Sequence, residues 1–134
     1  MHENWRDFIR GYTLANDVTA RDLQKKDGQW TRAKGCDTFC PVGPLVSDEL
    51  DLEAGLTLET RVNGDLRQQG STLDFIFSIP ELLAYISAAI TLEPGDLLLT
   101  GTPSGVGPLA AGDRVEVSIP GLGVLANTVQ PDAE

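Results

Sequence analysis

Apolar and polar residues alternate along much of this chain, and this pattern predicts β-strands. Apolar residues recur at every second position from Leu56 to Leu58 and return at Val62, which places them on one face of an extended strand. The dipeptide Asn63-Gly64 follows and suits a type I′ turn, because both central residues of that turn need positive φ angles. A returning strand completes a predicted hairpin. The predicted strands are residues 11–15, 56–62, 65–69, 97–99, 115–119 and 124–129.

One stretch instead has helical spacing. Ser78 can cap a helix, Pro80 falls in its first turn, and Glu81 stands at the capping-box position. The apolar positions that follow are Leu82, Leu83, Ile86 and Ile90. Residues 17–26 are expected to form a short helix or turn that Asn16 or Asp17 caps, and residues 4–10 a helical turn. The pattern predicts an α+β fold that is mostly β, a rolled mixed sheet with one or two helices.

Length and charge narrow the range of partners. The 134 residues correspond to one domain. A formal charge of −10 disfavours binding to nucleic-acid phosphates, so no nucleic-acid partner is expected. Acidic side chains can gather a divalent cation or simply keep the surface solvated. Because neither a long apolar stretch nor an apolar leader is seen, we expect no membrane partner and a cytoplasmic location.

The cysteines and the histidine exclude two kinds of chemistry. Cys36 and Cys40 are too few to complete a tetrahedral zinc site, and we expect them to be buried thiols in a reducing compartment. His2 is the only histidine and lies near the N-terminus, so a mechanism that pairs a nucleophile with a fixed imidazole is not expected within this chain.

Residues 16–24 form the first segment that could carry chemistry. If the segment is helical, Asp17, Arg21 and Gln24 lie on one face at positions i, i+4 and i+7. A carboxylate suits a hard cation, a guanidinium suits a substrate carboxylate, and an amide suits a carbonyl or hydroxyl group. The alternative is a helix cap followed by a surface Asp–Arg pair.

Two further segments are candidates. Lys34 lies between the small residues Ala33 and Gly35, where partial burial would let it bind an enolate or carboxylate oxygen; the alternative is a surface lysine. Residues 100–107, TGTPSGVG, could bring backbone N–H groups and the Thr102 hydroxyl to an anion; the alternative is a tight turn. We expect Asp17, Lys34 and Thr102 to face one pocket.

Taken in order, these segments resemble the C-terminal catalytic domain of the fumarylacetoacetate hydrolase family. The resemblance is carried by residues 11–24, 33–44, 62–68, 91–96 and 100–107. It implies a partial catalytic domain over residues 11–130, with terminal segments at 1–10 and 131–134. The fold that it implies is the family's mixed β-sandwich roll, usually as a homodimer.

The same resemblance implies a function. Members are divalent-metal-dependent hydrolases, decarboxylases and isomerases that act on 2-oxo or β-dicarbonyl acids through a metal-stabilised enolate. Their substrates are acylpyruvates, oxaloacetate or 2-hydroxyhepta-2,4-dienedioate, the last in aromatic catabolism. It also implies a role for each candidate residue: Asp17 as ligand of Mg²⁺ or Mn²⁺, Lys34 as the catalytic lysine, and Arg21, Gln24 and Thr102 as substrate-binding residues.

One part of the family pattern has no match. Members carry a histidine and a Glu-x-Glu pair ahead of this region, and Glu3 does not reproduce that pair. We therefore expect an N-terminally truncated domain with an incomplete metal site, because a lone carboxylate holds Mg²⁺ poorly. The alternative function is a non-catalytic remnant or subunit that folds and dimerises without a complete site.

Overall fold

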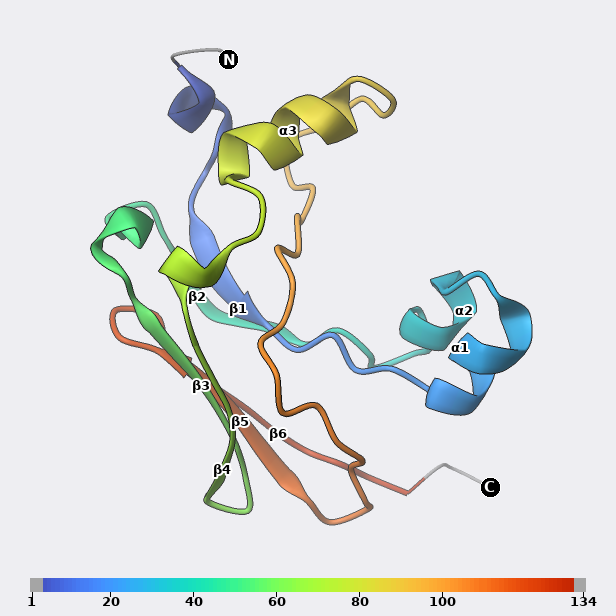
Figure 1. The fold of residues 1–134 in the computed structure, drawn as a ribbon. Helices are drawn as coiled ribbons and strands as arrows, with labels where there is room; N and C mark the ends of the chain where they lie inside the picture. Colours follow the sequence, from blue (N-terminus) through green and yellow to red (C-terminus); the bar gives the residue numbers. More distant parts are fainter. Residues whose placement is uncertain (1–3, 132–134) are drawn as a thin grey trace.

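The computed structural model describes residues 4–131, and His2 and Glu3 lie outside them. Two antiparallel sheets form the fold (Figure 1). One pairs β1 (Tyr12–Ala15) with β2 (Val42–Ser47), and the other has the order β4-β3-β5-β6. Its strands are β3 (Thr57–Val62), β4 (Asp65–Ser71), β5 (Arg114–Ile119) and β6 (Gly123–Thr128). The helices are α1 (Arg21–Asp27), α2 (Thr31–Lys34) and α3 (Ile79–Ser87), with single 3₁₀ turns η1 (Trp5–Phe8), η2 (Leu52–Ala54) and η3 (Thr72–Asp74).

The hydrophobic core lies where the two sheets meet. Leu14 of β1 is 1% exposed and packs with Val117 of β5, Leu125 of β6 and Leu122 of the turn between these strands. The expected fold class, a mostly β roll with few helices, is confirmed. Every strand pair in residues 4–131 is antiparallel, so this part of the chain lacks the parallel component of the expected mixed sheet.

The predicted hairpin and the predicted helix both form. Asn63 and Gly64 have φ angles of 52° and 88°, as the turn between β3 and β4 requires. Asn63 also ties this turn to β5, because its side-chain oxygen accepts a hydrogen bond of 2.9 Å from the backbone N–H of Arg114. At the start of α3, the N–H and hydroxyl of Ser78 each donate to Glu81 Oε2 at 2.7 Å. These hydrogen bonds lower the pKa of Glu81.

Other expectations were wrong in detail. Helix α1 begins at Arg21 and not at residue 17, because the N–H of Ala20 bonds to the Ala33 carbonyl at 2.9 Å and residues 16–20 stay extended or turned. Residues 97–99 form no strand. Strand β2 was not predicted, because Pro44 within it removes a backbone donor and weakens the strand pattern. Ile90 lies beyond the end of α3 and is 63% exposed.

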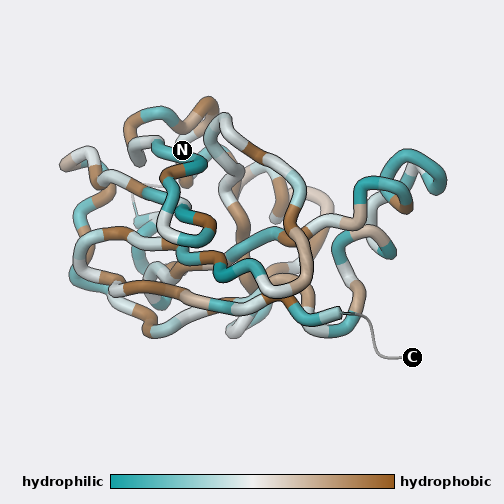
Figure 2. The backbone as a smooth tube through the Cα atoms, turned by 90° about the horizontal axis from the view of Figure 1, so that it is seen from below, coloured by the Kyte–Doolittle hydropathy of each residue, from teal (hydrophilic) through white to brown (hydrophobic). Residues whose placement is uncertain are grey.

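Two features frame the site. Helices α1 and α2 form a small lobe beside the sheets, and this lobe is largely hydrophilic (Figure 2). Cys36 and Cys40 are free thiols near it, and both are only half-buried, so their expected burial is incomplete. Within the described part of the chain, no helix has the length and apolar character that crossing a membrane requires.

Candidate functional site

Lys34 and Asp17 meet where the α1–α2 lobe joins β1. The Lys34 ammonium donates a hydrogen bond to Asp17 Oδ2 and lies 3.4 Å from Thr19 Oγ1. The side chains are 31% and 39% exposed, so the pair is open to solvent and to a ligand. The ring of Trp30 lies 5.8 Å from Lys34 Nζ and shields one side of the ammonium. The pair thus places a positive charge and a carboxylate at one accessible point.

Backbone hydrogen bonds fix both ends of this pair. The N–H of Asn16 donates to the Pro41 carbonyl at 3.1 Å, which anchors the chain just ahead of Asp17. Lys34 ends α2, and its N–H donates to the Trp30 carbonyl at 3.0 Å. Ala33, the residue before it, is completely buried and anchors α2 to the rest of the protein. The lysine is therefore attached to a fixed point although its ammonium is accessible.

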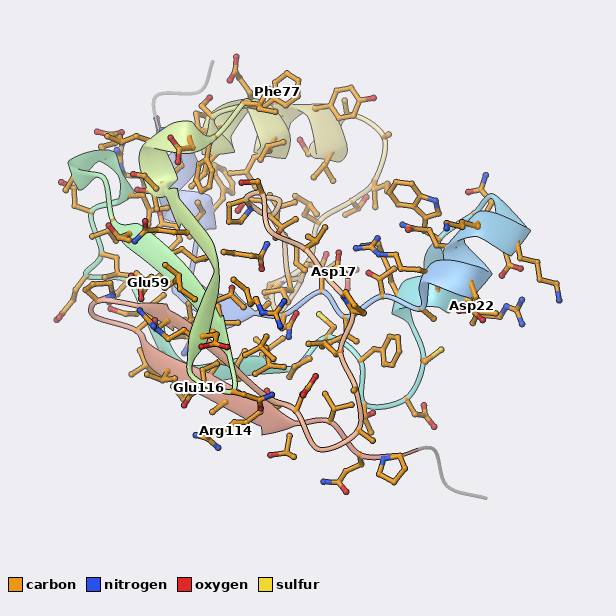
Figure 3. The ribbon with its side chains drawn as sticks, turned by 60° about the horizontal axis from the view of Figure 1, so that its bottom comes forward. Asp17, Asp22, Glu59, Phe77, Arg114 and Glu116 are labelled. Atoms are coloured by element: carbon orange, nitrogen blue, oxygen red, sulfur yellow. The ribbon has the colours of Figure 1, made fainter. Side chains whose placement is uncertain are left out.

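Arg21 and Gln24 form a second group on α1. Arg21 Nη1 donates to Gln24 Oε1 at 2.8 Å, as residues three apart on a helix can do. Asp17 precedes the helix, so the expected single helical face of Asp17, Arg21 and Gln24 was wrong. Asp17 instead comes from the loop after β1, between the four-stranded sheet and the α1 lobe (Figure 3).

Thr102 belongs to a third group, where the loop that carries it packs on β4. Gln68 Nε2 donates to Thr102 Oγ1 and to the Pro103 carbonyl, both at 2.8 Å. A Cβ at Gly70 would lie 2.9 Å from Pro103 Cβ, and a Cβ at Gly105 would overlap the carbonyl oxygen of Arg67. Residues 102–105 are thus clamped to the strand through glycines that permit the close approach. No role was predicted for Gln68, although it stands in the block 62–68 that resembles the family; strand alternation places it on the opposite face from Arg67 and Gln69.

The structure therefore brings the five predicted site residues into three local groups. Asp17 meets Lys34, Arg21 meets Gln24, and Thr102 meets Gln68. Within residues 4–131, no hydrogen bond or ion pair links one group to another. Their convergence on one pocket stays a prediction. Two depressions of the surface are lined by other residues, one at the β5–β6 turn and one beside Arg10.

Comparison with known proteins shows the family of the chain. The profile of the fumarylacetoacetate (FAA) hydrolase C-terminal family matches residues 1–130. The chain belongs to the fumarylacetoacetate hydrolase family. A solved structure of 2-hydroxyhepta-2,4-diene-1,7-dioate isomerase from Mycobacterium marinum superposes with a TM-score of 0.92 at 53% identity, over 96% of this chain and 51% of that one.

Two curated members of the fumarylacetoacetate hydrolase family are also similar. Oxaloacetate tautomerase YisK of Bacillus subtilis is 46% identical over 136 residues, covering 95% of this chain and 45% of the relative. The mitochondrial oxaloacetate tautomerase FAHD1 of Mus musculus is 48% identical over 121 residues, covering 87% and 55%. The chain spans about half the length of the curated relatives it matches.

The divalent cation that the resemblance to this family implies needs several oxygen ligands. Asp17 offers one carboxylate, which Lys34 already contacts. The other labelled acidic residues, Asp22, Glu59 and Glu116, come from other elements and lie apart from Asp17 in Figure 3. No three side chains among the histidines, cysteines, aspartates and glutamates of the described residues gather to hold a metal. Residues 4–131 by themselves therefore do not fit a complete magnesium site.

Proposed function

We propose that the chain carries part of an enzyme site that binds 2-oxo or β-dicarbonyl acids and stabilises their enolates. The observation that carries this proposal is the accessible Lys34–Asp17 pair, held at the base of the α1–α2 lobe. It is supported by the relatives, which are named as oxaloacetate tautomerases and as an isomerase of a 2-hydroxydienedioate. All three names describe a proton shift in a dicarboxylic acid with oxygen at position 2.

Lys34 is the proposed catalytic residue. Removing a proton from the carbon beside a ketone leaves negative charge on the ketone oxygen, and a nearby fixed ammonium lowers the free energy of that state. Asp17 and Thr19 hold the Lys34 side chain at two acceptors, which limits the directions in which the ammonium can point. The site is thereby arranged before the substrate arrives.

The remaining residues are proposed to bind the substrate's carboxylates. Arg21 has a guanidinium that can form two parallel hydrogen bonds with a carboxylate, and its bond to Gln24 orients it along α1. Thr102 would add a hydroxyl donor from the loop on β4. This role requires the loop and the α1–α2 lobe to face the same substrate. No hydrogen bond or ion pair of the described residues links the two, so their convergence is itself part of the proposal.

Keto–enol tautomerisation is the reaction that these residues support best. It moves one proton between carbon and oxygen, with solvent water as the proton acceptor and donor, and consumes no water, whereas hydrolysis of an acylpyruvate also needs a base that activates water as the nucleophile. Decarboxylation of oxaloacetate passes through the same enolate and is a neighbouring activity. A role for Asp17 as one ligand of Mg²⁺ or Mn²⁺ is proposed on the resemblance alone, and no step above depends on the cation.

The test follows the ketonisation of enol-oxaloacetate by ultraviolet absorbance, with and without added Mg²⁺. We expect the chain to accelerate it and Lys34→Met to reduce the acceleration at least about tenfold, because a charged hydrogen bond to the enolate is lost. Lys25→Met is the matched control, an exposed lysine on α1 that forms no side-chain hydrogen bond or ion pair within the described residues, and it should behave as the wild type. Equal rates for the two variants, or no acceleration by the wild type, would contradict the proposal.

The alternative of a non-catalytic remnant predicts no acceleration in any of these assays. The similarity to enzymes along almost the whole chain favours the catalytic proposal. The cytoplasmic location expected from the sequence stays a prediction, as do the homodimer and the place in aromatic catabolism that the resemblance implies.

A further inference from the structure

We infer that Gln68 is a positioning residue that sets the direction of the Thr102 hydroxyl, so that this hydroxyl donates its proton to a substrate carboxylate. The inference rests on the proposed function, in which Thr102 meets the substrate. It adds Gln68, on a different element from Thr102, as the residue that decides whether the site presents a hydroxyl proton or a lone pair to the substrate. Gln68 lies on β4, and Thr102 lies 34 residues further along the chain.

The first step concerns the orientation of the Gln68 amide. Its Nε2 lies 2.8 Å from the Pro103 carbonyl oxygen, which can only accept a hydrogen bond. Turning the amide around would bring two acceptor oxygens together at this distance, so the nitrogen must face Pro103. The same nitrogen is 2.8 Å from Thr102 Oγ1. Gln68 therefore offers only donors to Thr102.

The second step concerns the hydroxyl. A threonine hydroxyl has one proton and two lone pairs, and the bond from Gln68 occupies a lone pair. The proton of Thr102 must then point elsewhere, and the described residues provide no acceptor for it. A hydroxyl proton that is left free in this way can be donated to an anionic ligand, and hydrogen bonds to charged acceptors are the stronger kind.

The third step concerns rigidity. Gln68 is half-buried, and the backbone contacts on either side of it hold the loop against the strand. Gly105 packs on the Arg67 carbonyl on one side, and Gly70 packs on the Pro103 ring on the other. The loop therefore has little freedom to lift away and let the hydroxyl rotate. The amide is at the centre of this contact, where its N–H keeps the hydroxyl proton from pointing toward the strand.

Two substitutions at Gln68 separate orientation from packing. Gln68→Met keeps the length of the side chain and removes both donors, which frees the hydroxyl to rotate. Gln68→Glu replaces the donor nitrogen by an acceptor oxygen, which offers the Thr102 hydroxyl proton a partner and also repels the Pro103 carbonyl, so its effect should exceed that of Gln68→Met. We expect KM for enol-oxaloacetate to rise about threefold to tenfold for Gln68→Met and about tenfold to a hundredfold for Gln68→Glu, with kcat changed much less.

The controls use amides away from the loop. Gln69→Met alters the neighbouring glutamine, which bonds to Glu59 on the sheet. Asn127→Asp adds the same charge as Gln68→Glu on β6, the edge strand at the other side of the four-stranded sheet. Both should leave KM unchanged, and thermal melting should show that every variant folds.

A double-mutant cycle with Thr102→Val gives the decisive result. If Gln68 acts through the Thr102 hydroxyl, Gln68→Met should raise KM in the wild type and have no further effect once the hydroxyl is gone. Additive effects, or an unchanged KM in both Gln68 variants of an active chain, would overturn the inference and leave the proposed function standing. No activity in the wild-type chain would overturn the proposed function, and this inference with it.

Discussion

Gly105 lies so close to Arg67 of β4 that a side chain at position 105 would overlap the Arg67 carbonyl oxygen. Gly105 also has a φ angle of 103°, a conformation that residues with a Cβ rarely adopt. The loop that carries Thr102 can therefore rest on β4 only because this residue is glycine. This relationship connects a short motif in the sequence to the geometry of the candidate site.

The contact predicts a large effect for Gly105→Ala. The substitution should lower the free energy of unfolding by about 2–4 kcal/mol, since it adds both backbone strain and a steric overlap. Gly95→Ala is a matched control, because Gly95 has the same φ of 103° but open space around it. It should cost only about 1–2 kcal/mol of strain. Urea denaturation measures both, and equal losses would show that the contact with Arg67 contributes nothing.

A second prediction separates function from stability at the Lys34–Asp17 pair. Asp17→Asn removes the charged partner of Lys34, but the pair is partly exposed, so stability should change by about 1 kcal/mol or less. Activity on enol-oxaloacetate should fall at least about tenfold, because the ammonium loses its fixed position. Both quantities can be measured on one preparation by thermal melting and by absorbance.

Asp27→Asn is the control for that experiment. Asp27 accepts two hydrogen bonds of 2.7 Å from Arg32 in the same lobe, and these bonds lower its pKa. The substitution breaks a comparable ion pair without touching Lys34, so activity should remain. A similar loss of activity in both variants would mean that Asp17 acts only by holding the lobe together.

The elements that depend on neighbouring residues could be predicted from the sequence. The elements that depend on contacts between distant residues could not. The turn at Asn63-Gly64 and the start of α3 at Ser78 depend on neighbouring residues, so the sequence alone was sufficient for both. The start of α1 depends on the bond from Ala20 to Ala33, which a local pattern cannot reveal. Strand β2 forms around Pro44 because β1 offers it a partner.

The site shows the same division. Asp17 and Lys34 were each predicted from residue type and family resemblance, and the structure adds that they bond across 17 positions of sequence. The link between Gln68 and Thr102 spans 34 positions, and nothing in the spacing of either residue indicates it. Such contacts exist only after the hairpin and the core have placed the strand and the loop together.

The third prediction concerns acid. The pKa of Asp113 lies below its usual 3.8, because its carboxylate accepts hydrogen bonds from the N–H of Ala110 and the amide of Asn63. A lowered pKa in the folded state contributes stability that is present above the unfolded value and lost as the pH falls through the folded value. The melting temperature should therefore drop below about pH 4 as this carboxylate becomes protonated.

Asp113→Asn tests that assignment. The variant should melt below the wild type at pH 7, and the gap between the two should narrow steadily as the pH is lowered toward 2. Asp65→Asn, at the start of β4, removes a carboxylate without a hydrogen bond in the described structure and should show no such narrowing. A gap that stays constant with pH would mean that Asp113 stabilises the turn only through its shape.

The fourth prediction concerns the apolar surface around α3, which we expect a second copy of the chain to cover. Ile76 is 90% exposed, Tyr85 83% and Phe77 60%, and Phe77 lies at the outer edge of the molecule (Figure 3). Large exposed apolar side chains grouped on one surface favour association, because burying them removes apolar area from water.

We expect sedimentation velocity to show a concentration-dependent dimer of this chain that Ile76→Ser and Phe77→Ser weaken. Val124→Ser is the matched control, an apolar residue on β6 that is 50% exposed and belongs to a different surface. It should leave the dimer intact, because its side chain is not among those that the second copy would cover. A wild-type chain that stays monomeric at all concentrations would contradict the predicted dimer. Equal weakening by all three substitutions would indicate non-specific hydrophobic association instead of an interface at the α3 surface.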